Sequence, residues 1–369
     1  DSWPSRTEGP CDYKGQKILC GPVGLPLARS FLYENDGRGH FRDVSDPSGI
    51  GKKKAYGLGV AIGDYDRDGW PDVYVASDTT DNLLFRNLGN KTFQEVGLPA
   101  GVARNDMAIA QAGMGVEFAF VTSSEREDLF VVNYEDDTNT FYRNDGNGFF
   151  TEITSELGLA APCFKYLGWA CFFADFDLDA DLDLYVAQGH VVPQVDHAPS
   201  SSGYRQPNKL FLNDGSGRFT DATADAGPGL EVKESSRGAA YGDLDGDGDL
   251  DLVVSEMNGR ATVLECVGRP MGHWLAIDLR GTRSNRRGVD AVVRLEAGGK
   301  KQARRVRSGV GYASYCELRL RFGLGKSSTV DELIVEWPSG LHEAFDVPGV
   351  DRVLALEEGT GRTIRAGRP

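Results

Sequence analysis

A short acidic motif occurs three times in this chain and limits what the chain can fold into. Each copy has the pattern D-x-D-x-D-[GA]-x-x-D and leads directly into an apolar stretch, and the copies begin at Asp64, Asp175 and Asp243. A second motif, with an Asn before a turn rich in Gly, recurs around four asparagines that are 52, 57 and 69 residues apart: Asn35, Asn87, Asn144 and Asn213. Repeats of this length indicate stacked supersecondary units.

One unit reads as four short strands. The stretch "GLGVAI" precedes the first acidic loop and "VYVAS" follows it, and then "NLLFRN" and "TFQEV" flank a turn typical of a hairpin. Four antiparallel strands with this period are typical of a propeller blade, so we predict an all-β fold, a β-propeller with a small C-terminal β-domain. A solenoid is the alternative.

One unit keeps its strands but has lost its acidic loop. Residues 113–134 fit the repeat, with Asp128 in the last acidic position. Phe120, Thr122 and Ser124 stand where carboxylates are expected. We therefore predict a blade here without a metal site.

The three acidic loops are predicted to bind calcium. Calcium takes six to eight oxygen ligands, and a tight loop can direct positions 1, 3 and 5 at one point, with a backbone carbonyl from position 7 and a carboxylate from position 9. The predicted ligands are Asp64, Asp66, Asp68, Trp70 and Asp72; Asp175, Asp177, Asp179, Asp181 and Asp183; and Asp243, Asp245, Asp247, Asp249 and Asp251. Magnesium fits less well, and an acidic solvated turn without metal is the alternative.

About three calcium ions per chain are expected, and their expected role is structural. Each ion would neutralise clustered charge and fasten a hairpin that has little core of its own. Gly69 and Gly248 permit the sharp turn at position 6, whereas Ala180 makes this turn less comfortable in the second loop.

Charge is divided unevenly along the chain. The net charge is −15; residues 1–270 carry 23 Lys and Arg against 43 Asp and Glu, and residues 271–369 carry 17 against 12. The excess of negative charge on the larger part argues against nucleic acid as a partner. The change of sign indicates a domain boundary near residue 270. We expect no membrane span, because no apolar run approaches the roughly 18–20 residues that a bilayer requires.

The acidic loops resemble the calcium-binding blades of FG-GAP, or VCBS, repeats. Residues 272–340 resemble the ASPIC/UnbV domain through "HWL", "GTRSNRRGVDA", "SGVGY", "FGLG" and "EWPSG". The combination resembles the cartilage acidic protein family over nearly the whole chain. This resemblance implies a Cys-containing segment at 1–28, integrin α-like propeller blades at 29–270, an ASPIC/UnbV β-domain at 271–358 and a polar tail at 359–369.

The resemblance also implies a larger ring, since such propellers are usually seven-bladed. We count four complete units, preceded by half a unit at residues 31–44. Because unpaired strand edges invite aggregation, we expect that the chain is incomplete or that a second polypeptide completes the propeller. A smaller ring closed by this chain alone is the alternative.

The six cysteines are Cys11, Cys20, Cys163, Cys171, Cys266 and Cys316. None lies in a C-x-x-C motif, and sequence alone leaves 15 connectivities. Short loop spans favour the pairs 11–20 and 163–171, and a shared departure from the family pattern favours 266–316. We predict these three disulfides, with buried free thiols as the alternative, and hence a secreted, extracellular or periplasmic location.

Few other residues suggest binding or chemistry. His190 is one candidate. Arg304, Arg305 and Arg307 form a basic run that can bind an anionic glycan or surface; a solvated strand and docking against the acidic propeller are the alternatives. No G-x-S-x-G, H-E-x-x-H or phosphate-cradling loop appears. We predict a binding or scaffold protein for a protein or glycan ligand. The alternative class is a tailoring enzyme or lyase with a blade-top active site.

Overall fold

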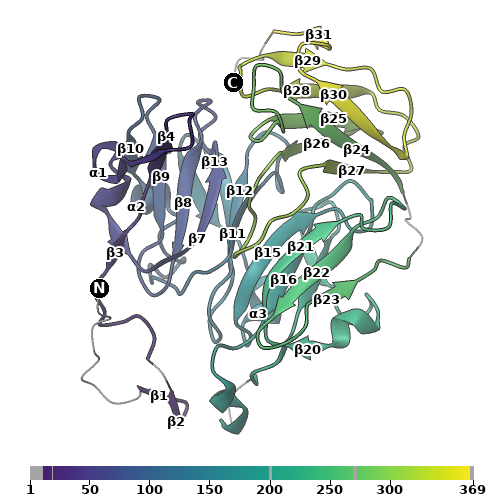
Figure 1. Ribbon diagram of the computed structural model, residues 1–369. Coiled ribbons are helices and arrows are strands. Elements are labelled where there is room, and N and C mark those ends of the chain that lie inside the picture. Colours follow the sequence, from purple (N-terminus) through teal and green to yellow (C-terminus); the bar gives the residue numbers. More distant parts are fainter. Residues whose placement is uncertain (1–10, 19, 199–201, 269–271, 366–369) are drawn as a thin grey trace.

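The computed structural model describes residues 11–18, 20–198, 202–268 and 272–365. It is an all-β structure, as predicted: blades stand side by side beneath a C-terminal domain of two sheets, and an N-terminal hairpin lies at the opposite end (Figure 1). The described helices are single turns: α1 (Ser45–Ser48), α2 (Gly97–Ala100), α3 (Ala160–Cys163), η1 (Ile50–Lys52), η2 (Pro193–His197) and η3 (Pro228–Glu231).

Four antiparallel sheets form the propeller blades, and each runs in chain order from its inner strand outward. The first blade contains β7 (Gly57–Gly63), β8 (Asp72–Ser77), β9 (Leu83–Asn87) and β10 (Phe93–Glu95). The second contains β11 (Val116–Ala119), β12 (Asp128–Val131), β13 (Thr140–Gly146) and β14 (Phe149–Glu152). The third contains β15 (Gly168–Ala174), β16 (Asp183–Gln188), β18 (Lys209–Asn213) and β19 (Phe219–Asp221). The fourth contains β21 (Ser236–Gly242), β22 (Asp251–Glu256) and β23 (Thr262–Leu264).

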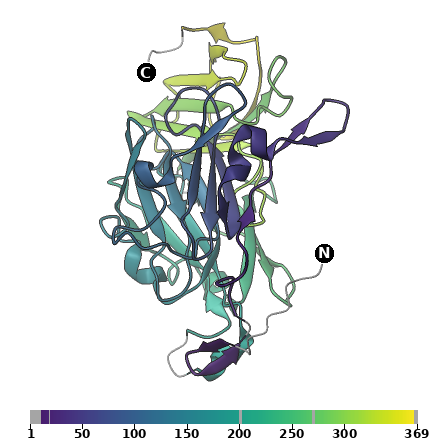
Figure 2. The same ribbon diagram turned by 90° about the vertical axis from the view of Figure 1, so that its left-hand side faces the viewer.

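Three short strand pairs accompany the blades. They are β3 (Ala28–Arg29) with β6 (Lys54–Ala55), β4 (Tyr33–Asn35) with β5 (Phe41–Asp43), and β17 (Gln206–Pro207) with β20 (Lys233–Glu234). The β4–β5 hairpin falls in the half unit expected at 31–44 and forms a sheet of its own. In Figure 2 this purple hairpin projects from the side of the molecule.

The propeller core lies between the faces of neighbouring blades. Along β15, Trp169, Cys171 and Phe173 pack in a cluster with side chains of the second blade. Ala170 and Phe172 point to the other face and pack with side chains of the fourth blade. Successive residues of a strand point to opposite faces, so a strand between two blades is apolar throughout, and all seven residues of β15 are buried.

The first blade has one covered face and one exposed face. Ala61 of β7 packs against the second blade. Val60 and Ile62, which alternate with it, are 55% and 44% exposed. The outer face of β7 is therefore an apolar sheet surface in contact with solvent.

Two glycines let the inner strands approach closely. A Cβ atom at Gly59 would lie 1.9 Å from the carbonyl oxygen of Met114, and one at Gly115 would lie 2.0 Å from that of Trp169. No side chain fits at these separations, so only glycine permits this approach. The starts of β7, β11 and β15 are drawn together as a result.

The C-terminal domain packs two sheets around its own core. One sheet contains β24 (His273–Arg280), β27 (Leu320–Gly325) and β30 (Arg352–Glu357), with β24 parallel to β30. The other contains β25 (Val292–Ala297), β26 (Lys300–Arg305), β28 (Glu332–Glu336), β29 (His342–Ala344) and β31 (Arg362–Thr363). Leu275, Val293, Phe322 and Val335 are fully buried between the sheets. Strand β31 pairs with β29, so strand structure extends to Thr363, inside the segment 359–369 expected to be a polar tail.

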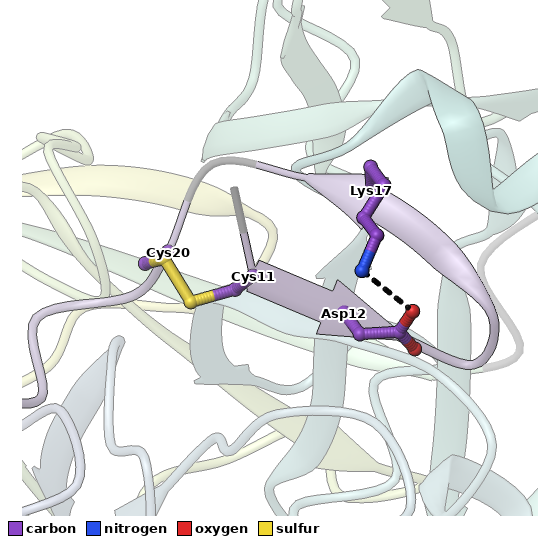
Figure 3. Close-up of a disulfide and its surroundings, with 4 residues drawn as sticks. All are labelled: Cys11, Asp12, Lys17 and Cys20. Atoms are coloured by element: carbon purple, nitrogen blue, oxygen red, sulfur yellow. Dashed lines mark ion pairs between the residues drawn. A yellow bond between two sulfur atoms is a disulfide. The ribbon is translucent and has the colours of Figure 1, made fainter. Parts of the chain in front are cut away.

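The N-terminal hairpin carries one predicted disulfide. Strands β1 (Cys11–Tyr13) and β2 (Gln16–Ile18) pair, and Cys11 is bonded to Cys20 with their Cα atoms 5.1 Å apart. Figure 3 shows this bond beside the ion pair between Asp12 and Lys17, whose charged atoms are 3.3 Å apart. The prediction of a Cys11–Cys20 disulfide is confirmed.

The predicted bonds Cys163–Cys171 and Cys266–Cys316 are wrong, because all four residues are free thiols. Cys163 and Cys171 lie in the core between the second and third blades, and Cys316 lies in the core between the third and fourth. Burial raises the pKa of Cys163 and Cys316 to about 12, which suppresses the thiolate that forms a disulfide. These three thiols instead serve as small apolar side chains.

The assignment of core and surface on the inner strands predicts unequal effects of truncation. Phe173 packs against the rings of Phe130 and Phe141, with centroids 5.8 and 6.2 Å away. Phe173→Ala should lower the free energy of unfolding by about 3–5 kcal/mol. Ile62→Ala, on the exposed face, should lower it by less than about 1 kcal/mol. Urea unfolding followed by circular dichroism measures both, and equal losses would contradict the assignment.

Candidate metal centres

Three turns bring carboxylates together. They join the first two strands of the first, third and fourth blades. In each turn the aspartates at motif positions 1, 3 and 9 offer oxygens that lie within 4.8 Å of one another: Asp64, Asp66 and Asp72; Asp175, Asp177 and Asp183; and Asp243, Asp245 and Asp251. The carboxylates predicted at position 5, those of Asp68, Asp179 and Asp247, do not belong to these groups. The backbone carbonyls expected from position 7, those of Trp70, Asp181 and Asp249, stay a prediction.

The position 5 side chains shape the turns. Each accepts a hydrogen bond from the backbone amide two residues later: Asp68 from Trp70 at 3.0 Å, Asp179 from Asp181 at 2.9 Å, and Asp247 from Asp249 at 3.1 Å. At position 6, Gly69 and Gly248 have φ values of 87° and 106°, and Ala180 has 84°. An alanine in this left-handed region is strained, as the sequence predicted for the second loop.

The position 9 aspartate has a structural role that sequence reasoning missed. The carboxylate of Asp72 accepts a hydrogen bond from the amide of Asn87 at 2.7 Å and another from that of Tyr65 at 3.2 Å. The equivalent carboxylate accepts the same two backbone hydrogen bonds in the other blades. Asp183 accepts them from Asn213 and Phe176, Asp251 from Cys266 and Leu244, and Asp128 from Asn144 and Thr122. This aspartate therefore ties the acidic turn to the outer strands.

Among the described residues, the acidic group of the third blade forms no ion pair, and that of the first blade forms one, between Asp66 and Arg86 at 2.5 Å. Burial, reinforced by neighbouring carboxylates, raises the pKa of Asp72 and of Asp183 to about 8. The same causes raise the pKa of Asp175 to about 7 and that of Asp64 to about 6. A cation among these oxygens would favour their ionised forms.

The second blade, which lacks an acidic group, receives guanidinium groups instead. The buried carboxylate of Glu127 accepts a hydrogen bond from Arg305 Nε at 2.9 Å and another from Arg307. Its second oxygen accepts one from the amide of Asp64 at 3.3 Å. Glu127 thus joins the second blade to the C-terminal domain and to the neighbouring acidic turn.

The C-terminal domain also contacts the acidic turns of the third and fourth blades. The contacts are Arg321 with Asp243 at 2.8 Å, the Gly323 amide with Asp175 at 3.0 Å, and Lys300 with Asp181 at 2.6 Å. Two of these acceptors, Asp175 and Asp243, belong to the acidic groups themselves. The domain therefore lies over the ends of the blades that carry the acidic turns, as Figure 1 shows.

The basic run lies in this interface. The guanidinium of Arg304 stacks over Phe322, 5.3 Å from the ring centroid, and donates to Gln302 at 3.1 Å, while Arg305 and Arg307 contact Glu127. The arrangement is that of docking against the acidic propeller. No signal in the sequence pointed to Glu127 as the partner, because the two sides are about 180 residues apart.

His190 is fully buried at the other end of the propeller. Its Nδ1 accepts a hydrogen bond from the Val192 amide at 3.1 Å, and its Nε2 lies 3.7 Å from Glu135. Burial lowers the pKa of His190, which favours the neutral imidazole. Tyr13 and Lys14 of the N-terminal hairpin bond to the same carboxylate of Glu135, so this histidine belongs to the anchor of the hairpin.

Removal of the Glu127 charge should loosen the interface. Glu127→Gln leaves Arg307 buried without a counter-charge and leaves Arg305 with Asp290 as its remaining partner, so the free energy of unfolding should fall by about 3 kcal/mol. Glu125→Gln is the matched control, because its side chain is 55% exposed and its ion pairs are worth less than about 1 kcal/mol. Urea unfolding and limited proteolysis between the domains measure the difference, and equal behaviour of the two variants would refute the role of Glu127.

Comparisons with known proteins agree with this architecture. The FG-GAP-like repeat model matches residues 26–75, 64–119, 121–186 and 200–254, and the ASPIC and UnbV model matches residues 281–363. Cartilage acidic protein 1 of Mus musculus and that of Homo sapiens are each 27% identical over 350 residues. The match covers 92% of this chain and 49% or 48% of the relative. The chain thus spans about half the length of the curated relatives it matches.

Solved structures resemble the chain only loosely. A lectin of Agrocybe aegerita, described as recognising non-reducing terminal N-acetylglucosamine, is 18% identical, with a TM-score of 0.29. The match covers 65% of this chain and 75% of the lectin. A TM-score below 0.5 supports no inference about this chain. The repeat matches, together with the blades and turns described above, show that the chain belongs to the FG-GAP-like repeat family and carries an ASPIC and UnbV domain.

Proposed function

We propose that the chain is a calcium-stabilised β-propeller that serves as a binding or scaffold protein for a protein or glycan. The observation that carries this proposal is the recurrence of one group of three carboxylates at the same turn of three blades. Hard oxygen ligands in a tight turn suit calcium. In these turns the ion would fasten the first two strands of a blade to each other.

The residues present fit such an ion. Asp64, Asp175 and Asp243 would hold it with the aspartates at positions 3 and 9 of their own turns, and the position 5 and 7 residues are within the same loops. In the acidic turn of the fourth blade, both carboxylate oxygens of Asp249 are buried without a hydrogen-bond partner among the described residues. Calcium would supply positive charge beside these buried oxygens.

The location that we propose is outside the cytoplasm, in a secreted, extracellular or periplasmic setting. The Cys11–Cys20 disulfide supports it, since such bonds persist in oxidising compartments. The name of the relatives, cartilage acidic protein 1, is consistent with an extracellular setting. No helix in the described part of the chain is both long and apolar enough to cross a membrane.

Calcium binding is testable by stoichiometry. Isothermal titration should find three ions per chain, and chelation should lower the thermal midpoint. Asp177→Ala should reduce the number to two, because Asp177 contributes to one acidic group only. Asp225→Ala, an exposed acid outside the groups, is the control and should retain three. Failure of the chelated wild-type chain to bind calcium would overturn the proposal.

We also propose a protein partner that supplies further propeller blades. Together with this chain it would form a seven-bladed ring. Val60 and Ile62 occupy the face of β7 that corresponds to the covered face of β11 and β15 in the next two blades. Exposed apolar sheet surfaces of this kind mark interaction sites. A neighbouring blade would bury these side chains as the second blade buries Ala61.

This exposed face should cause the isolated chain to self-associate. Val60→Glu combined with Ile62→Glu should lower the sedimentation coefficient at high concentration toward that of a monomer. Val263→Glu, which changes an exposed valine on the outer strand of the fourth blade, is the control and should not have this effect. A wild-type chain that stays monomeric up to the highest concentration would contradict the proposed partner surface.

A further inference from the structure

A large hollow lies at the end of the propeller opposite the acidic turns. Its volume is about 1050 Å³, and it lies between the N-terminal hairpin and the starts of the inner strands. Leu58, Met114 and Trp169 form its floor. Each of these residues stands at the same place in its blade, six positions before the first acidic position or its equivalent. The repeat therefore builds this floor in the same way as it builds the acidic turns.

The roof of the cavity is firmly attached. The hairpin is closed by the Cys11–Cys20 bond, which Figure 3 shows, and Lys14 Nζ donates to the buried carboxylate of Glu135 at 2.8 Å. The hydroxyl of Tyr13 donates to the same carboxylate. These bonds join segments that are more than 120 residues apart in the chain. The cavity thus has a defined roof as well as a defined floor.

The walls are mainly apolar and aromatic. Val23, Val191 and Leu58 line the cavity although they are 69%, 42% and 42% exposed, and Tyr134 lines it beside them. Ligand pockets typically have such walls, with few polar groups to orient the ligand, and volumes of about 300–1000 Å³. A ligand with an apolar body would remove these side chains from water.

The charge of the lining is not balanced. Asp12 and Lys17 form an ion pair with each other, with 3.3 Å between the charged atoms. Asp78 also lines the cavity, and its carboxylate forms no ion pair or hydrogen bond with the residues that the structure describes. Desolvation raises the pKa of Asp78, as expected for a carboxylate without a cationic neighbour. A ligand that brings a positive charge would complete this lining.

We propose that this cavity binds an organic ammonium ligand with an apolar body. The ammonium group would lie beside the carboxylate of Asp78 and the ring of Tyr134, because carboxylates and aromatic faces both attract organic cations. The hydrocarbon part would cover Leu58, Met114 and Val191. This site is separate from the acidic turns and does not depend on the calcium proposal, so either can fail alone.

Octylammonium, 1-octanol and octanoate are suitable probes, because they share a hydrocarbon chain and differ in charge. Titration calorimetry of the full chain, with and without calcium, should give octylammonium an affinity about tenfold higher than that of 1-octanol, and octanoate the weakest binding. Equal affinities for the amine and the alcohol, or no binding of any probe, would overturn the proposal.

Two variants test the residues. Asp78→Asn should bring the affinity ratio of amine to alcohol close to one while 1-octanol still binds, and Asp225→Asn, an exposed acid elsewhere, should leave the ratio unchanged. Leu58→Lys should abolish amine binding through charge repulsion, whereas Leu58→Met should preserve it. Thermal midpoints confirm that each variant is folded. A ratio that survives Asp78→Asn would refute the assignment of the carboxylate.

Discussion

A buried aspartate holds the two halves of each blade together. In all four blades the carboxylate at motif position 9 bonds to an amide in the adjacent turn and to an amide of an outer strand or the segment that follows it. Asp128 keeps both bonds although it belongs to none of the three acidic groups. This residue therefore has a folding role in every blade, and the proposed metal binding would add the carboxylates at positions 1 and 3 to it.

Ion pairs with three blades hold the C-terminal domain over the acidic end of the propeller. In the second blade, Glu127 is neutralised by Arg305 and Arg307, whereas the turns of the third and fourth blades receive Lys300 and Arg321. Since removing charge from water costs free energy unless a partner compensates it, the buried carboxylate of Glu127 needs the two guanidinium groups that face it. Residues 1–270 carry a net negative charge and residues 271–369 a net positive charge, which agrees with this contact between the two parts.

The sequence was informative about local structure and much less so about distant partners. The periodic motifs predicted the strands, the blades and the turns that group the carboxylates, because turn geometry depends on neighbouring residues. The same reasoning placed two disulfides that do not form, because spacing along the chain cannot show that Cys163 and Cys171 pack in an apolar core. Likewise, the burial of His190 and the contact of Arg307 with Glu127 depend on segments far apart in sequence, for which the chain carries no local signal.

The inner strand of a blade connects two ends of the propeller that differ in chemistry, the end with the apolar cavity and the end with the acidic turns. In β7, Leu58 faces the apolar cavity and Asp64 follows the last residue, so six residues of extended chain separate them by about 20 Å. Charges on the surface are screened beyond about 8–10 Å at physiological ionic strength. An ion at the acidic turn would therefore have little direct electrostatic effect on a ligand beside Asp78, and any influence between the two ends would have to pass through the packing of the blades. Because β15 is buried on both faces while β7 is exposed on one, that influence would be strongest along the inner strands that have a neighbour on each side.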